Sequence, residues 1–157
     1  MTPSFVSDKK DVRESHRISD LTIPALKKRV GPIAVKFGLK LAILFGSVAR
    51  GRVRADSDID IGIVPGSSIF EVPDLYRDFM EDFEPIENDY QRGIDIVQIT
   101  SENIILLKRI LEEGILLYEY QRHYYSMQRL HWRFLVEDNY RYTLNYSDII
   151  NRRLEMF

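Results

Sequence analysis

Cysteine is absent from this chain of 157 residues, and histidine occurs three times, at His16, His123 and His131. Without cysteine the chain forms no disulfide, no zinc–thiolate site and no thiolate nucleophile. The three histidines are too few and too scattered for a multi-histidine metal centre. These absences exclude the cysteine-based and histidine-rich classes of functional site.

Long apolar runs and a strong excess of one charge are also missing. The longest apolar runs hold about five residues, far below the roughly 20 of a membrane-spanning helix, and the N-terminus has no apolar core of a signal peptide. A net charge of -2 argues against holding duplex nucleic acid by broad phosphate neutralisation. With 45% hydrophobic residues, we expect one cytoplasmic domain that binds neither membrane nor duplex nucleic acid.

What the chain does contain is concentrated in Leu41–Val64, LAILFGSVARGRVRADSDIDIGIV. An apolar run breaks at Gly46-Ser47, an arginine-bearing loop follows, and a second apolar run carries Asp58 and Asp60. Because successive side chains of a strand alternate between its faces, the two aspartates point the same way. Two carboxylates on one face repel each other unless a cation bridges them. Oxygen ligands on a rigid strand suit Mg²⁺.

A third aspartate has the same setting. The segment Gly93–Ile99 alternates around Asp95 and predicts another strand. If this strand pairs beside the first, Asp95 points to the same face as the other two carboxylates. Three such carboxylates can hold two metal ions about 4 Å apart, an arrangement suited to phosphoryl or nucleotidyl transfer. Asp95 is also placed to accept a proton from the attacking hydroxyl.

The glycine–serine break supplies an anion site. A strand that ends in glycine and turns into a helix presents free backbone N–H groups, and Ser47 adds a hydroxyl and an N-cap. Arg50, Arg52 and Arg54 are candidates to contact a triphosphate, with Arg50 nearest. Each feature alone also fits a plain turn, a surface acidic pair or a solvated loop. Their occurrence in one strand–turn–strand unit favours a functional site.

The first half of the chain alternates between helical and extended patterns. A helix is predicted from Ile23 to Phe37, with Thr22 as N-cap, a kink or break at Gly31-Pro32 and a stop at Gly38. The following predicted elements are a strand over Lys40–Phe45, a helix within Ile69–Phe83 that begins near Pro73, and an acidic loop over Glu84–Arg92.

The second half begins with a helix over Glu102–Glu113, capped by Thr100 or Ser101 and ended by Gly114. A short strand over Ile115–Tyr118 follows. From these patterns we divide the chain into a flexible lead-in (1–20), a principal domain (21–118) and a helical, Tyr/Arg-rich C-terminal extension (119–157).

The motifs Gly46-Ser47-Val48-Ala49-Arg50-Gly51 and Asp56-Ser57-Asp58-Ile59-Asp60-Ile61 resemble the GSxARG…SDxDL signature of the minimal nucleotidyltransferases. The resemblance covers about Ile23–Tyr118. It implies an α+β fold like the polymerase-beta palm, a small mixed β-sheet flanked by helices, here with a C-terminal helical extension. It implies Mg²⁺, with two ions expected, and ATP as substrate.

The same resemblance implies roles for single residues. Asp58, Asp60 and Asp95 match the catalytic metal ligands, and Gly46, Ser47, Arg50 and Ser57 fall in the nucleotide-binding motif. Small members resemble the antitoxin of HEPN/MNT toxin–antitoxin pairs, in which a tyrosine of the HEPN ribonuclease accepts AMP. The chain lacks the Arg-x4-6-His motif of the toxin, which places it on the transferase side.

Two alternatives to this activity stay open. The acceptor of the nucleotide is a small molecule or an RNA end in other nucleotidyltransferases. A chain of this kind also neutralises a toxin if it binds the toxin without catalysis. The intact set of three aspartates argues against the second alternative.

The segment 118–146 departs from the family pattern, because tyrosines and arginines alternate there around Trp132. Helical packing onto the domain is one interpretation. A surface for the HEPN-type partner is the other, because Tyr, Trp and Arg are enriched at binding hot spots. Single-stranded nucleic acid on the same face fits the net charge less well.

Overall fold

The computed structural model describes residues 21–52, 54 and 56–154, with side chains as far as residue 145. The lead-in predicted for residues 1–20 lies outside the described residues. Within this described part, no helix is both long and apolar enough to pass through a membrane.

Four strands form one mixed sheet in the order β3-β2-β1-β4. Strand β1 (Leu39–Phe45) pairs antiparallel with β2 (Ile59–Pro65) and with β4 (Ile115–Glu119). Strand β3 (Ile94–Gln98) runs parallel to β2. The predicted α+β class with a small mixed sheet is therefore confirmed, and the strand of Asp95 does pair beside the strand of Asp60.

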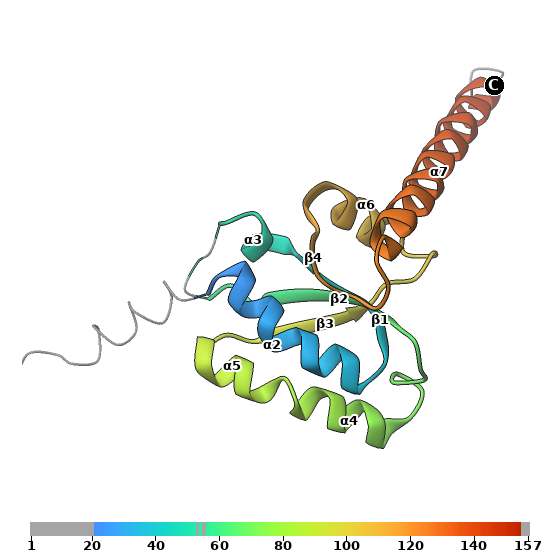
Figure 1. The fold of residues 1–157 in the computed structure, drawn as a ribbon. Coiled ribbons are helices and arrows are strands. Elements are labelled where there is room, and N and C mark those ends of the chain that lie inside the picture. The colour runs from blue at the N-terminus through green and yellow to red at the C-terminus, as the bar shows by residue number, and fades with distance from the viewer. Residues whose placement is uncertain (1–20, 53, 55, 155–157) are drawn as a thin grey trace, which may run out of the picture.

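Helices α2 (Ile23–Lys36), α4 (Pro73–Glu81) and α5 (Glu84–Tyr90) cover one face of the sheet (Figure 1). Thr22 caps α2 as predicted, because its hydroxyl accepts a hydrogen bond from the N–H of Ala25 at 3.3 Å. Gly38, at φ +63°, follows the end of this helix. Gly31-Pro32 does not split α2, so that part of the prediction was wrong.

Two further predictions are corrected by the structure. Residues 84–90 form helix α5 and not an acidic loop, because Ile86 and Tyr90 lie four residues apart and are buried together. Pro85 stands in the first turn of α5, where its missing N–H costs nothing. The N-cap of the following helix is Asn103, whose side chain accepts from the N–H of Leu106 at 3.1 Å. Neither Thr100 nor Ser101 has that role.

The other face of the sheet carries α6 (Ile104–Glu113) and the beginning of α7 (Tyr124–Leu154). Trp132 of α7 is 3% exposed and packs in a small core with Leu107 and Ile110 of α6. Beyond this contact, α7 extends away from the body of the molecule (Figure 1). The predicted C-terminal helical extension is confirmed.

The two sides of α7 differ. Leu135 and Val136 pack with Trp132 against the domain, and the guanidinium of Arg129 donates to the hydroxyl of Tyr125 and to the carbonyl of Leu111, each at 3.1 Å. Away from the domain, three apolar side chains at helical spacing are 67–70% exposed: Met127, Leu130 and Phe134.

Candidate functional site

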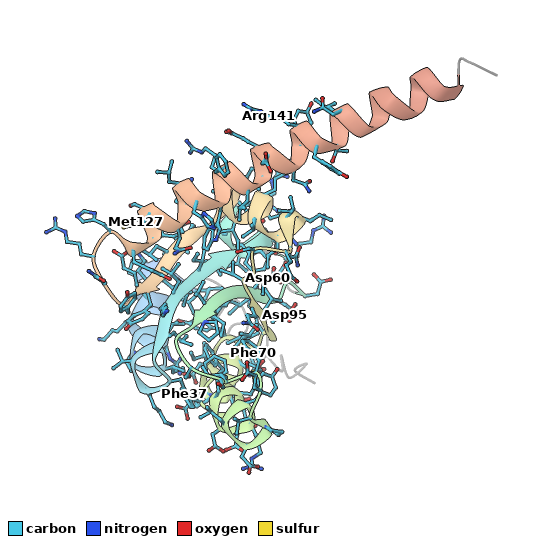
Figure 2. All side chains as sticks on the ribbon, turned by 90° about the vertical axis from the view of Figure 1, so that its right-hand side faces the viewer. Phe37, Asp60, Phe70, Asp95, Met127 and Arg141 are labelled. Atoms are coloured by element: carbon cyan, nitrogen blue, oxygen red, sulfur yellow. The ribbon has the colours of Figure 1, made fainter. Side chains whose placement is uncertain are left out.

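The three aspartates lie where β2 and β3 begin. Asp58 directly precedes β2, while Asp60 and Asp95 are the second residues of β2 and β3. Asp60 and Asp95 are partners in the parallel register, and partner residues share a face of the sheet. Figure 2 shows the two side by side. The isoleucines that alternate with these aspartates, Ile59, Ile61, Ile94 and Ile96, are buried on the opposite face.

Asp60 is the carboxylate whose charge is least favoured. Partial burial raises the pKa of its carboxyl above the usual range, and the charge of Asp95 raises it further. Arg109 of α6 lowers this pKa, whereas Asp58 and Glu113 add to the increase. The site is therefore a concentration of negative charge, and a cation that bound there would relieve the repulsion.

A magnesium ion is implied by the resemblance, and the donor set meets that requirement in part. Among the residues that the structure describes, no three side chains of His, Asp or Glu are grouped closely enough to hold a metal ion. The donors are nevertheless of the right chemistry, because Mg²⁺ prefers carboxylate oxygens together with substrate phosphates. The repulsion among the carboxylates is consistent with a cation site. The residue types at the site therefore suit Mg²⁺.

The turn after β1 brings its backbone against Asp60. Gly46 begins the short helix α3 (Gly46–Ala49) at φ +76°. A Cβ atom built on Gly46 would lie 2.0 Å from Oδ2 of Asp60, so the carboxylate would have to move if another residue stood there. Glycine at position 46 is thus favoured both by the backbone conformation and by the carboxylate beside it. Ser47 is the second residue of α3 and not its N-cap, which is Phe45. Its predicted capping role was wrong.

Glu113, the last residue of α6, reaches this turn from the other side. Its Oε1 accepts a hydrogen bond from the N–H of Gly46 at 2.8 Å, and its Oε2 accepts from the guanidinium of Arg50. Burial alone would raise the pKa of Glu113, but the bonds from Arg50 and Gly46 lower it below the usual value, with help from the charges of Arg50 and Arg109. A carboxylate therefore occupies the donors that were predicted to bind phosphate.

Three of the four predicted nucleotide-binding residues, Ser47, Arg50 and Ser57, line one hollow. It has a volume of about 380 Å³, and its other lining residues are Arg52, Arg54 and Asp56. The hydroxyl of Ser57 accepts from the N–H of Arg54 at 3.0 Å and so helps to shape the loop. The guanidiniums of this loop give the hollow a surface suited to a polyanion.

Three residues of the site were missed by sequence reasoning: Arg92, Arg109 and Glu113. Arg92 is 6% exposed and donates to the carbonyls of Arg54 and Ser57, each at 2.7 Å. These two hydrogen bonds hold the arginine-bearing loop in place. The available signal for Glu113 was an acidic residue in the last helical turn, where the helix dipole disfavours negative charge. Arg109 stands one turn earlier, 3.6 Å from Glu113.

Comparison with known proteins agrees with this geometry. The model of one family, described as "Polymerase beta, Nucleotidyltransferase", matches residues 30–123, more than half of the chain. The matched segment includes all three aspartates, the Gly46 turn and Glu113. The chain therefore belongs to the polymerase beta nucleotidyltransferase family, and the predicted family is confirmed.

One relative of known sequence and two solved structures are similar to this chain. A protein of Methanocaldococcus jannaschii named "Putative protein adenylyltransferase MJ0435" is 33% identical over 95 residues, which are 60% of this chain and 97% of that protein. A crystal structure of a toxin–antitoxin with AMP-PNP has a TM-score of 0.56 at 18% identity, over 82% of this chain and 98% of its own. A complex of a tri-AMPylated Shewanella oneidensis HEPN toxin with MNT antitoxin has a TM-score of 0.53 at 16% identity. The match covers 85% of this chain and 99% of that chain. These structures share the fold.

Proposed function

We propose that this chain is a cytoplasmic, Mg²⁺-dependent enzyme that transfers AMP from ATP to a tyrosine hydroxyl of a HEPN-type ribonuclease toxin, and so serves as its antitoxin. The observation that carries the proposal is the pairing of Asp60 with Asp95 beside the Gly46 turn. The name of the Methanocaldococcus relative supports protein adenylylation. The toxin–antitoxin structures of the same fold support the kind of partner.

Each residue has a role in this reaction. Asp58, Asp60 and Asp95 would hold Mg²⁺, which supplies charge neutralisation at the phosphates. Gly46, Ser47, Arg50 and Ser57 would orient the triphosphate. The acceptor oxygen attacks the α-phosphorus, the bond from that phosphorus to the bridging oxygen breaks, and pyrophosphate leaves with the electron pair. Asp95 takes the proton of the hydroxyl.

The test incubates this chain with α-³²P-ATP, Mg²⁺ and the protein encoded by the neighbouring gene, and follows transfer of the label. We expect label on a tyrosine of the partner, lost in the double variant Asp58→Asn plus Asp60→Asn. Asp74→Asn is the matched control, because Asp74 lies on α4 with its side chain 82% exposed. Toxin neutralisation by the double variant would instead support binding without catalysis. Label on RNA or on a small molecule alone would contradict the proposed acceptor.

The outer side of α7 is the proposed partner surface within residues 118–146. Met127, Leu130 and Phe134 follow one side of the helix and are largely exposed, while Trp132 on the other side is buried. Contiguous exposed apolar side chains often mark a protein–protein contact. Aromatic and basic side chains of the same segment fit the composition of binding hot spots.

Point substitutions test this surface better than truncation, because removal of Trp132 would open the core beneath α7. We expect Leu130→Ser plus Phe134→Ser to reduce partner binding about a hundredfold or more while the unfolding temperature stays nearly unchanged. Ile105→Ser, at another exposed apolar position (77% exposed) on α6, is the control. Full partner binding by the double variant would rule out this surface.

A further inference from the structure

The turn at Gly46 already binds an anionic group, and that group belongs to the chain itself. Glu113 accepts from the N–H of Gly46 at 2.8 Å and from the guanidinium of Arg50. Its side chain is 13% exposed, against 43% for Arg50. The carboxylate is thus the less accessible partner, and it satisfies two donors from the inner side of the turn.

The same two donors are those assigned to the triphosphate in the proposed function. A backbone N–H at a strand end and an arginine fork are typical phosphate ligands. The N–H of Gly46 carries a single hydrogen, so a phosphate and the Glu113 carboxylate compete for it. On Arg50 the two anions share a fork of five N–H donors, of which Nη1 already bonds Glu113. The carboxylate of Glu113 therefore places a negative charge beside Gly46 and Arg50, where the proposed function places a phosphate.

Arg50 lines two neighbouring hollows, so its side chain can reach either of them. One is the 380 Å³ hollow that it shares with Ser47, Ser57 and the other loop arginines. The second, about 500 Å³, lies on the side of Glu113 and Gly114 and is also lined by Arg50 and Arg52. Glu113, the ion-pair partner of Arg50, lines only the second hollow.

We propose that Glu113 is an internal competitor of the nucleotide: its carboxylate occupies Gly46 and Arg50 in the free enzyme and is displaced when the triphosphate binds. This inference rests on the proposed nucleotide site. It makes Glu113 a residue that sets affinity for the nucleotide and holds the turn in order before the nucleotide arrives.

Displacement leaves Glu113 with a partner. Nε of Arg109 lies 3.6 Å from Oε1 of Glu113 on the same helix, and the guanidinium of Arg109 stacks over the ring of Phe45 at 5.1 Å. The mostly buried carboxylate of Glu113, once released from Arg50, would therefore keep one cation beside it. This arrangement lowers the cost of the exchange, because an unpaired buried charge is strongly unfavourable.

The test compares the binding of AMP-PNP with Mg²⁺ by wild type, Glu113→Gln and Glu112→Gln, measured by titration calorimetry. In Glu113→Gln the amide side chain keeps the shape of the original and an acceptor for Gly46, but it forms no ion pair with Arg50. We expect Glu113→Gln to bind about tenfold more tightly. Glu112→Gln removes the same charge from a neighbouring side chain that is 64% exposed and pairs with Lys108, and we expect a change of less than about twofold.

The outcomes separate the two proposals. If wild type binds AMP-PNP and Glu113→Gln binds it equally or more weakly, Glu113 is a fixed support, and the competition is overturned while the nucleotide site stands. If none of the three proteins binds AMP-PNP, both proposals are overturned. Equal tightening in both variants would show a general charge effect and would overturn the competition.

A measurement on the wild-type chain does not depend on how the variant folds. In a carbon-13 NMR titration with inorganic triphosphate, the side-chain carboxyl signal of Glu113 should shift as it leaves Arg50, while that of Glu112 stays in place. An unchanged Glu113 signal at saturation would overturn the proposal.

Discussion

The two faces of strand β2 are built from the same seven residues and have opposite properties. On one face Ile59, Ile61 and Ile63 are completely buried beneath the helical layer. On the other, Asp60 and the preceding Asp58 concentrate negative charge with Asp95 of the neighbouring strand. Burial of the first face stabilises the fold, whereas charge on the second face opposes it.

This difference explains how one short strand serves both stability and chemistry. The alternation of side chains separates the two roles by a single residue. The buried face fixes the backbone, and the fixed backbone holds like charges closer together than they would remain in a flexible segment. Substitutions on the two faces should therefore change stability in opposite directions.

Asp60→Asn should have the largest effect: it should slow catalysis and at the same time stabilise the fold. Loss of a proposed metal ligand should slow AMP transfer about a thousandfold. Because the pKa of Asp60 is raised in the folded protein, ionisation at neutral pH costs stability, and the neutral amide should raise the Tm of the metal-free protein. Calorimetry and a transfer assay check both, with Asp74→Asn as control. A lower Tm would contradict the account of the charge.

Ile61→Ala should lower the free energy of unfolding by about 3 kcal/mol, through lost burial and the cavity left behind. Ile61 is completely buried on the face away from the aspartates. Ile105→Ala, at a side chain that is 77% exposed, should change it by less than about 0.5 kcal/mol. Urea unfolding of both variants measures the difference, and similar values for the two would refute the division of the faces.

Gly46→Ala and Gly51→Ala separate backbone strain from contact with Asp60. Both glycines have positive φ, +76° and +68°, but a Cβ on Gly51 meets no atom of the described residues within 4 Å. We expect Gly51→Ala to cost about 1 kcal/mol of stability from strain alone. Gly46→Ala should cost about 2 kcal/mol or more and should also displace the Asp60 carboxylate. Equal unfolding free energies in the two variants would show that the close approach does not matter.

The smallest effect is the pH dependence of stability, where Asp60 and Glu113 should act in opposite directions. The pKa of Glu113 is lowered from 4.5 in the folded protein, so its contribution is present above that value and is lost as the pH falls through the folded pKa. The pKa of Asp60 is raised from 3.8, so its contribution is present below that value and is lost as the pH rises through the folded pKa.

Unfolding curves between neutral and acidic pH measure this opposition. Relative to wild type, Glu113→Gln should flatten the loss of stability on acidification. Asp60→Asn should be more stable than wild type at neutral pH and should approach it at acidic pH. Parallel curves for all three proteins would mean that neither carboxyl is perturbed in the folded chain.

The sequence alone was enough for the sheet, most helices and the family. Alternation in β2 and β3 predicted which side chains share a face, and the Gly46-Ser47 and Asp58/Asp60 motifs predicted the neighbourhood of the site. Local periodicity was insufficient for α5, because its acidic composition resembles a loop and only burial of Ile86 and Tyr90 makes it a helix. It was also insufficient for α7, where Trp132 and Phe134 look alike in sequence but lie on a buried and an exposed side.

What the sequence by itself determined is the set of contacts that follow from residue spacing: the aspartates on one face, and glycine where the chain must turn. What only the tertiary structure decided is the meeting of Glu113 with Gly46 and Arg50, across 67 and 63 residues of chain. The physical reason is that alternation is a local property of the backbone. The approach of the end of α6 to the start of α3 depends on how both helices pack on the sheet, which no single segment encodes.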